Sequence, residues 1–323
     1  MHKIIIDTDP GIDDAQAIAF AVAHPHIELL ALTTVFGNAE VDQTTNNALA
    51  VLAELNQHEI PVAKGAAKPL SIDRFPAPDF VHGADGMGNL NLVGDPRALS
   101  ALNAAEFIVQ TANQNLGEVS LIAIGPLTNV ALALKLDPDL PSKLKQLIVM
   151  GGTVSALGNV SPVAEANFIN DPHAADIVCQ QDWPLSVVGL DVTMQVALTD
   201  DDFKALEKKA GSVGKFLWQS SRFYVDFYSA SPQPLSEKRA CAMHDASALV
   251  YLVSPDLFEV DKGVARVSTL GAAMGQLIVT NTPDNYLLEH WQNLPEVSMA
   301  MRVQSRKVVA NFMQTLIDYY STH

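Results

Sequence analysis

The chain has 323 residues, two cysteines and a formal net charge of -16, from 20 Lys plus Arg against 36 Asp plus Glu. Such an acidic balance disfavours nucleic acid and anionic membranes as partners, because both are bound by basic surface patches. No apolar run approaches the roughly 18 residues of a membrane span, and the N-terminus does not read as a secretory signal. Two cysteines in a chain this long indicate no disulfide framework, so we expect a cytoplasmic location.

Apolar strands alternate with helices along the first 190 residues. Strands without polar alternation, each followed by a helix, are typical of a parallel sheet covered on both faces. We expect strands over residues 3–6, 27–35, 119–124, 146–150 and 185–190, and helices over 13–24 and 41–55, near 101–113, and from Thr128 and Asp171.

The rest of the chain is predicted to be helical at first and then mixed. Residues 200–253 favour helices interrupted at Pro232 and Pro234, and apolar runs follow near 263–267, 276–280 and 298–303 before a terminal helix from about Arg306. No domain boundary is evident. The sequence therefore predicts an α/β fold in a single domain over residues 1–323. Its central sheet is open and mostly parallel, flanked by helices, with a helical insertion near the functional site.

The stretch DTDPGIDDA crowds four carboxylates directly behind the first strand. Ligands of parallel sheets bind beyond the carboxyl ends of the strands. A helix N-terminus stabilises one or two acids by itself, so a capped turn accounts for Asp13 or Asp14 alone. The full cluster needs another counter-charge, because no Lys or Arg lies between Lys3 and Lys64. Oxygen-only ligands favour a hard cation, Ca²⁺ or Mg²⁺.

Further polar residues follow other predicted strands. Thr128, taken alone, is best explained as a helix N-cap. His244 and Asp245 begin an apolar helix, either as a surface histidine and a cap or as an acid–base group beside a metal carboxylate. Nothing near Cys241 marks it as an activated thiol. The other candidates are Asn38 in VFGN and, in the Gly-rich stretch after the strand at 146–150, Asn159, Glu165 and Asn167.

Taken in order, the motifs DTDPGIDDA, TTVFGN, GPLTN, GNVSPVAEANF and HDA resemble the inosine–uridine-preferring nucleoside hydrolases over residues 4 to about 250. The resemblance implies an α/β enzyme that binds Ca²⁺ and hydrolyses the N-glycosidic bond of ribonucleosides to ribose and free base, through an oxocarbenium-like transition state. It also implies a homodimer or homotetramer, and a ribonucleoside as the small-molecule partner.

The resemblance also implies roles for individual residues. Asp9 would be the general base for water, His244 would assist the departing base, and His82 in VHGADGMG matches a loop histidine near the nucleobase. The family often has Phe where this chain has Ala166, so an aromatic group is lost there or Phe168 replaces it. The implied Ca²⁺ ligands are Asp9, Asp14, Asp245 and the backbone carbonyl of Thr128, and the implied ribose contacts are Asp13, Asn38, Asn159, Glu165 and Asn167.

Two other functions stay open from the residues themselves. The run IIIDTDPG offers the Asp-x-Asp of a Mg²⁺-dependent phosphohydrolase of haloacid-dehalogenase type, although Pro10 and Gly11 stand where that family has x-Thr. A non-catalytic nucleoside- or Ca²⁺-binding module would keep the metal and ribose contacts but needs no His244.

Within the nucleoside hydrolase family that the chain resembles, the HDA motif favours the inosine–uridine or pyrimidine-using branch. The aromatic residues of the stretch 222–242 either line a base pocket or belong to the core: Phe223, Tyr224, Phe227 and Tyr228.

Overall fold

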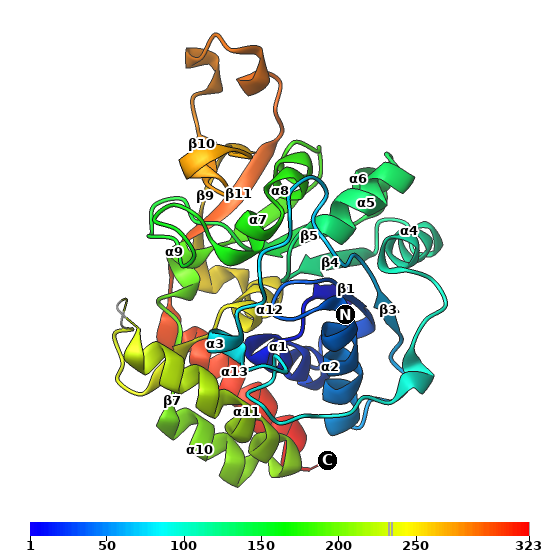
Figure 1. Ribbon diagram of the computed structural model, residues 1–323, viewed down its shortest axis with the longest axis vertical. Helices are drawn as coiled ribbons and strands as arrows, with labels where there is room; N and C mark the ends of the chain where they lie inside the picture. Colours follow the sequence, from blue (N-terminus) through cyan, green and yellow to red (C-terminus); the bar gives the residue numbers. More distant parts are fainter. Residues whose placement is uncertain (232, 234, 323) are drawn as a thin grey trace.

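A computed structural model describes residues 1–231, 233 and 235–322 (Figure 1). Its main element is a nine-stranded sheet of order β10-β9-β11-β6-β5-β4-β1-β2-β3. The strands from β11 to β3 are parallel, whereas β9, near one edge, pairs antiparallel with both of its neighbours, β11 and β10. The sheet strands are β1 His2–Thr8, β2 Ile27–Thr34, β3 Val62–Lys64, β4 Val119–Ala123, β5 Gln146–Met150, β6 Leu185–Val188, β9 Phe258–Val267, β10 Leu277–Thr280 and β11 Glu296–Val303.

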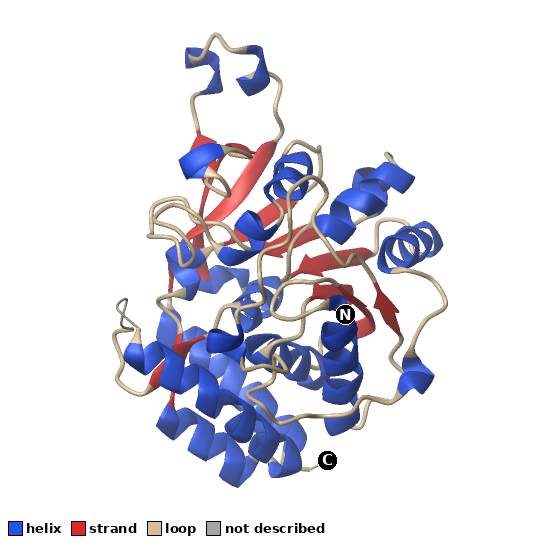
Figure 2. Cartoon of the chain, in the orientation of Figure 1, coloured by secondary structure: helices blue, strands red, loops and turns tan. Residues whose placement is uncertain are grey.

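Helices cover both faces of this sheet (Figure 2). Strand β1 explains why, because its side chains are buried on both sides: Ile4 and Ile6 belong to one hydrophobic cluster and Ile5 to the other. The first cluster includes residues of α1 Ile12–Ala23, α2 Val41–Glu54, α11 Gly211–Ala230, α12 Asp245–Val253 and α13 Ser305–Tyr320. The second includes residues of α4 Ala104–Gln114, α5 Thr128–Leu136 and α8 Pro172–Cys179.

Shorter elements complete the fold. Strands β7 Ala197–Thr199 and β8 Ala240–Ala242 form a separate antiparallel pair; β7 precedes α11 in the sequence and β8 follows it. No helix of the described residues is long and apolar enough to cross a membrane. The remaining helices are α3 Asp79–His82, α6 Leu140–Lys143, α7 Ala166–Asn170, α9 Leu190–Thr193 and α10 Asp200–Lys209.

The predicted fold class, an open and mostly parallel sheet between helices, is confirmed. Three local predictions differ. Strand β3 was not predicted, because three residues are too few to show a pattern. The strand predicted to reach Leu190 ends at Val188, since Gly189 caps α9. Strand β8 interrupts a stretch predicted to be mainly helical. The predicted helix breaks at Pro232 and Pro234 lie outside the described residues.

The strand order brings distant motifs to one edge of the sheet. β1 lies between β2 and β4, and Asp7 is in register with Thr33 on one side and Ala123 on the other. The chain leaves all three strands in the same direction because they are parallel. The acidic stretch, the loop with Asn38 and the GPLTN turn therefore meet at the carboxyl edge, where ligands of such sheets bind.

Candidate active site

A cavity of about 640 Å³ lies at the carboxyl ends of β1, β2, β4 and β5. No Lys or Arg of the described residues lines it. Asp9 and Asp14, which are also predicted site residues, do not line this cavity. Their exposed fractions are 2% and 0%. The predicted residues in its walls are Asp13, Asn38, His82, Asn159, Glu165, Asn167, His244 and Asp245.

Asp9 is packed between two glycines. A side-chain carbon at Gly37 would lie 1.9 Å from Asp9 Oδ2, and one at Gly125 would lie 2.7 Å from Oδ1. The glycines of VFGN and GPLTN therefore make room for this carboxylate. Oδ2 accepts a hydrogen bond of 2.8 Å from the main-chain N–H of Asn38. Oδ1 is buried without a protein partner.

Asp13 and Asp14 occupy the first turn of α1 and differ in the number of hydrogen bonds that their carboxylates accept. Asp14 accepts hydrogen bonds from the Thr8 hydroxyl, the Gly11 N–H (2.8 Å) and Asn38 Nδ2 (3.1 Å). Asp13 Oδ2 accepts one from the Tyr224 hydroxyl at 3.2 Å, whereas its Oδ1 is buried without a partner. Asp14 is thus held in place by the protein, and Asp13 has a free acceptor beside the cavity.

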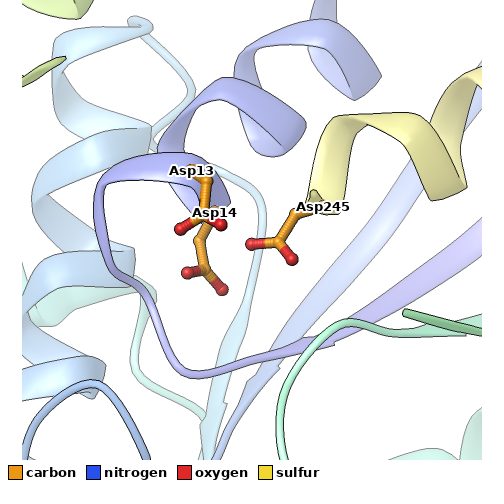
Figure 3. Close-up of side chains that lie close together, drawn as sticks. All are labelled: Asp13, Asp14 and Asp245. Atoms are coloured by element: carbon orange, nitrogen blue, oxygen red, sulfur yellow. The ribbon is translucent and has the colours of Figure 1, made fainter. Parts of the chain in front are cut away.

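Asp13, Asp14 and Asp245 form a compact carboxylate cluster, in which oxygen atoms of all three lie within 4.8 Å of one another (Figure 3). Burial, and then the charge of Asp14, raise the pKa of Asp13 to about 8. Burial, followed by the charges of Asp13, Asp14 and Asp9, raises the pKa of Asp245 well above its usual value. The charge of Asp9 thus lies close enough to raise the pKa of Asp245, although Asp9 does not belong to the cluster of Asp13, Asp14 and Asp245.

A hard divalent cation fits this cluster. Its donor set consists of carboxylate oxygens, which Ca²⁺ and Mg²⁺ prefer. Two acceptor atoms, Asp9 Oδ1 and Asp13 Oδ1, are buried without any hydrogen bond, and buried carboxylates of this kind either stay protonated or bind a cation. The cluster supports a metal site but does not distinguish between the two ions.

The geometry around Thr128 argues against its predicted role. Thr128 is the first residue of α5 after the N-cap Leu127, so its carbonyl points along the helix axis towards the residue four positions on. Its hydroxyl donates to Asp171 Oδ2 at 2.7 Å, so the N-cap explanation fails as well. Ile124, just before this turn, lines the cavity wall, and its carbonyl accepts a hydrogen bond from Asn167 Nδ2 at 3.0 Å.

The predicted ribose residues after β5 are held mainly by main-chain groups. Glu165 caps α7, and its carboxylate accepts from the N–H groups of Gly152, Asn167 and Phe168 at 2.8, 2.8 and 3.1 Å. Burial raises the pKa of Glu165 to about 7. Asn167 uses its Nδ2 on the carbonyls of Ile124 and Met150, so its Oδ1 is the atom left for a ligand.

His244 is fixed by hydrogen bonds at both ring nitrogens. Its Nδ1 lies 2.7 Å from Thr193 Oγ1 and its Nε2 lies 2.6 Å from Tyr228 Oη. Burial lowers the pKa of His244 to about 4, so the ring is neutral at pH 7. Cys241, three residues earlier, is also buried, and burial raises the pKa of its thiol far above neutrality. A buried neutral thiol is no nucleophile.

His82 ends α3 and lies over the start of α1. Its Nδ1 accepts the Ile12 N–H at 3.3 Å, and its ring stacks on Tyr224 with centroids 5.2 Å apart. Burial lowers the pKa of His82 to about 3. Its 4.0 Å approach to Asp13 Oδ1 is therefore a contact of a neutral ring and not an ion pair.

The structure adds residues that the sequence left undecided or did not suggest. Of the aromatic residues in α11, Tyr224, Phe227 and Tyr228 line the cavity, whereas Phe223 packs against the core. The four-residue spacing of Tyr224 and Tyr228 was the available signal, because it places both on one helix face. Nothing in the sequence linked Thr193 to His244.

The Ala166 position also has a clear outcome. Ala166 lines the cavity. Phe168 is 0% exposed and sits against Gly151 and Gly152, where an added side-chain carbon would meet its ring at 2.5 and 2.9 Å. Phe168 is therefore a core residue and does not replace an aromatic group beside the sugar.

Comparison with known proteins identifies the family. The family model described as "Inosine-uridine preferring nucleoside hydrolase" matches residues 4–310. The chain belongs to this family. It is accordingly an N-glycosidase that hydrolyses ribonucleosides, and the phosphohydrolase alternative is not favoured. The family is metal-dependent, which agrees with the carboxylate cluster.

Individual relatives of this nucleoside hydrolase cover 80% to 98% of its length. It is 42% identical over 316 residues to "Probable uridine nucleosidase 1" of Oryza sativa subsp. japonica, covering 98% of this chain and 96% of that protein. It is 39% identical to "Pyrimidine-specific ribonucleoside hydrolase RihA" of Shewanella sp. (strain ANA-3), over 80% of each. A solved structure named "Plant nucleoside hydrolase - PpNRh1 enzyme" is similar with a TM-score of 0.93 at 36% identity, covering 98% of this chain and 99% of that one.

One buried acid of this nucleoside hydrolase lies behind the site. Asp7 is 0% exposed, and its Oδ1 accepts from Thr33 Oγ1 at 2.5 Å and from Asn129 Nδ2 at 2.8 Å. Its Oδ2 has no partner. Burial raises the pKa of Asp7 to about 7. The folded state thus binds this proton more tightly than the unfolded state, so the stability contributed by Asp7 falls as pH rises towards 7.

We predict that Asp7→Asn stabilises the metal-free protein relative to the parent more at pH 8 than at pH 5. An uncharged amide removes the cost of ionising Asp7, which between these pH values is on the order of 2 to 3 kcal/mol. Urea unfolding in chelator at both pH values measures the difference. If parent and variant lose stability in parallel between pH 5 and 8, Asp7 does not titrate as described.

Proposed function

We propose that this nucleoside hydrolase is Ca²⁺-dependent and that Asp9, Asp14 and Asp245 are its side-chain ligands. The observation that carries the proposal is the buried cluster of Asp13, Asp14 and Asp245, with the charge of Asp9 close enough to raise the pKa of Asp245 and no Lys or Arg among the described residues of the cavity wall. For the main-chain ligand we replace Thr128 by the carbonyl of Ile124. When bound, the cation neutralises the carboxylates, acidifies water and orients the ribose diol.

The ribose hydroxyls are held by Asp13, Asn38, Asn159, Glu165 and Asn167 in this proposal. All five line the cavity, and they present both carboxyl and amide groups to a diol. Asp13 Oδ1 has no other partner. Hydrogen bonds from fixed side chains orient C1′ for attack without further reorganisation.

Asp9 acts as the general base. Water attacks C1′, its proton passes to Asp9, and the N-glycosidic bond breaks with its electron pair moving to the nucleobase. Asp9 Oδ1 is free of hydrogen bonds, and burial raises the pKa of this carboxyl, which makes it a better proton acceptor. Positive charge that develops on the ribose ring is stabilised by the surrounding carboxylates, because they act more strongly on the transition state than on the substrate.

His244 assists the departing base through Tyr228, whose hydroxyl gives its proton to the base. The resulting phenolate is stabilised by the hydrogen bond from His244 Nε2–H and regains the proton that Asp9 took from water. A neutral histidine with Nε2 protonated donates to the Tyr228 oxygen, while Thr193 donates to Nδ1. The Tyr228 hydroxyl is then free to donate towards the cavity that it lines. His82 and Tyr224 contact the base from the α3 side.

We further propose uridine and related pyrimidine or inosine nucleosides as substrates, on the strength of the relatives' names and the HDA motif. Nucleotides are excluded by charge, because a 5′-phosphate would meet carboxylates and no Lys or Arg in the described cavity wall.

We keep the expectations of a single domain over residues 1–323, of a homodimer or homotetramer, and of a cytoplasmic location. Cys179 and Cys241 are both buried and free, which suits a reducing compartment.

Chelation should abolish release of ribose from uridine, and Ca²⁺ should restore it. Calcium binding should release protons, because the raised pKa values of Asp13 and Asp245 leave them protonated in the metal-free protein, and affinity should fall as pH falls. Calorimetry in two buffers of different ionisation enthalpy measures this release. Asp245→Asn should weaken binding at least about tenfold, whereas Asp42→Asn, an exposed carboxylate, should not. Full activity in chelator would refute the metal dependence.

His244→Ala should slow uridine hydrolysis by roughly 10²- to 10⁴-fold, because a pyrimidine leaves poorly without a proton. Hydrolysis of 4-nitrophenyl riboside should fall far less, since its leaving group is already stable as an anion. Steady-state rates on both substrates test this, with Cys241→Ala as a buried neighbour that should leave the ratio unchanged. Equal losses on both substrates would rule out the acid role.

Uridine should be hydrolysed much faster than UMP by the calcium-loaded protein. The 5′-phosphate adds negative charge to a pocket that has no cation of its own in the wall, so the kcat/KM for UMP should be at least about 10²-fold lower, a loss that like-charge contacts readily produce. Reducing-sugar release under matched conditions measures both. Comparable rates would show that the charge argument is wrong.

A further inference from the structure

Asn47 in α2 joins the two loops that frame the cavity. Its side chain is buried, with 1% exposed. Nδ2 donates to the carbonyl of Pro10 at 2.9 Å and to the carbonyl of Asp85 at 2.8 Å, and Oδ1 accepts from Gln43 Nε2 at 2.8 Å. A side-chain amide has only two N–H groups, so both donors of Asn47 are spent on these two carbonyls.

The first loop, residues 9–14, carries the carboxylates, and Pro10 lies inside it. The second loop, residues 82–91, begins at His82. Asp85 organises this second loop by accepting main-chain N–H bonds from Met87, Asn89 and Asn91 at 2.8, 2.8 and 2.6 Å. The N–H of Gly88 returns to the carbonyl of His82 at 2.8 Å. A force applied at the Asp85 carbonyl is therefore transmitted to His82 through a hydrogen-bonded turn.

The two loops approach each other closely at Asn47. Gly86 has a φ of +75°, and a side-chain carbon there would lie 3.0 Å from Asn47 Nδ2 and 3.5 Å from the Pro10 carbonyl. Among the described residues the loops share one direct hydrogen bond, from the Ile12 N–H to His82 Nδ1, and at 3.3 Å it is longer than either bond of Asn47. Asn47 is thus the stronger connection.

We infer that Asn47 is a positioning residue that couples the carboxylate loop (9–14) to the nucleobase loop (82–91), so that ordering the first by a cation also orders the second. The inference rests on the proposed function for the cation and for His82. Losing Asn47 leaves two buried carbonyls without donors at once, which releases both loops together.

Hydrogen exchange of the full chain tests the coupling. In the parent, Ca²⁺ should slow amide exchange in both loops. In Asn47→Ala, exchange should be faster in both loops without metal, by roughly tenfold, and Ca²⁺ should still protect 9–14 but no longer 82–91. Asn46→Ala is the matched control. Asn46 precedes Asn47 on α2. It donates to the Leu92 carbonyl at 2.9 Å and accepts from the Gly94 N–H at 3.0 Å, and in the described part of the chain no hydrogen bond joins it to residues 9–14.

Gly86→Ala perturbs the same contact from the loop side and serves if the Asn47 variant does not fold. It should also uncouple the loops, because the added carbon pushes against Asn47. A double-mutant cycle with His82→Ala gives a second readout. If Asn47 acts through His82, the losses in kcat/KM for uridine should overlap and not multiply.

Unchanged exchange in both loops of Asn47→Ala, with the parent's calcium protection kept, would overturn the inference. Failure of the proposed function looks different. If calorimetry detects no Ca²⁺ binding or the parent releases no ribose from uridine, the metal or substrate assignment fails, while faster metal-free exchange in both loops of Asn47→Ala still supports the coupling.

Discussion

The burial of several carboxylates close to one another is the main constraint at the carboxyl edge of the sheet. Asp9, Asp13 and Asp14 come from one short stretch and Asp245 from α12. Burial raises the pKa of all four, and neighbouring carboxylate charges raise those of Asp9, Asp13 and Asp245 further. The protein satisfies part of this charge with N–H, amide and hydroxyl donors, most fully at Asp14. A hard cation supplies what these donors lack, so metal binding and the stability of the edge are linked.

Main-chain groups hold several of the acids of the site in fixed positions. Glycines allow the main chain to touch the acids: Gly37 and Gly125 enclose Asp9, and larger residues there would collide with its oxygens. Glu165 is fixed by three main-chain N–H groups. A constellation held by backbone is rigid and needs little reorganisation when charge develops on the substrate.

The two histidines of the cavity wall, His82 and His244, differ from the carboxylate cluster because they are neutral. Burial keeps His82 and His244 uncharged at pH 7. Neither therefore adds a standing positive charge that would compete with a cation for the carboxylates. Thr193, His244 and Tyr228 form a line of hydrogen bonds from α9, α12 and α11, and we propose that this line assists the leaving base.

The sequence by itself determined the class of fold and most of the chemistry. Unbroken apolar strands such as 4–6 predicted a sheet buried on both faces, and the carboxylate cluster without a basic neighbour predicted a hard cation. Both arguments depend on local composition, which a sequence displays directly. The predicted cavity residues, from Asp13 to Asp245, were found from local motifs and from the family that these motifs resemble.

Only the tertiary structure decided which residues line the cavity and which residues support them. Near the GPLTN turn the lining residue is Ile124, whereas Thr128 is already inside α5. Phe168 is a core residue because Gly151 and Gly152 receive its ring. Thr193 and Asn47 reach their partners across 51 and 38 residues of sequence. Contacts of that separation depend on how the strands are ordered in the sheet, and no local pattern records that order.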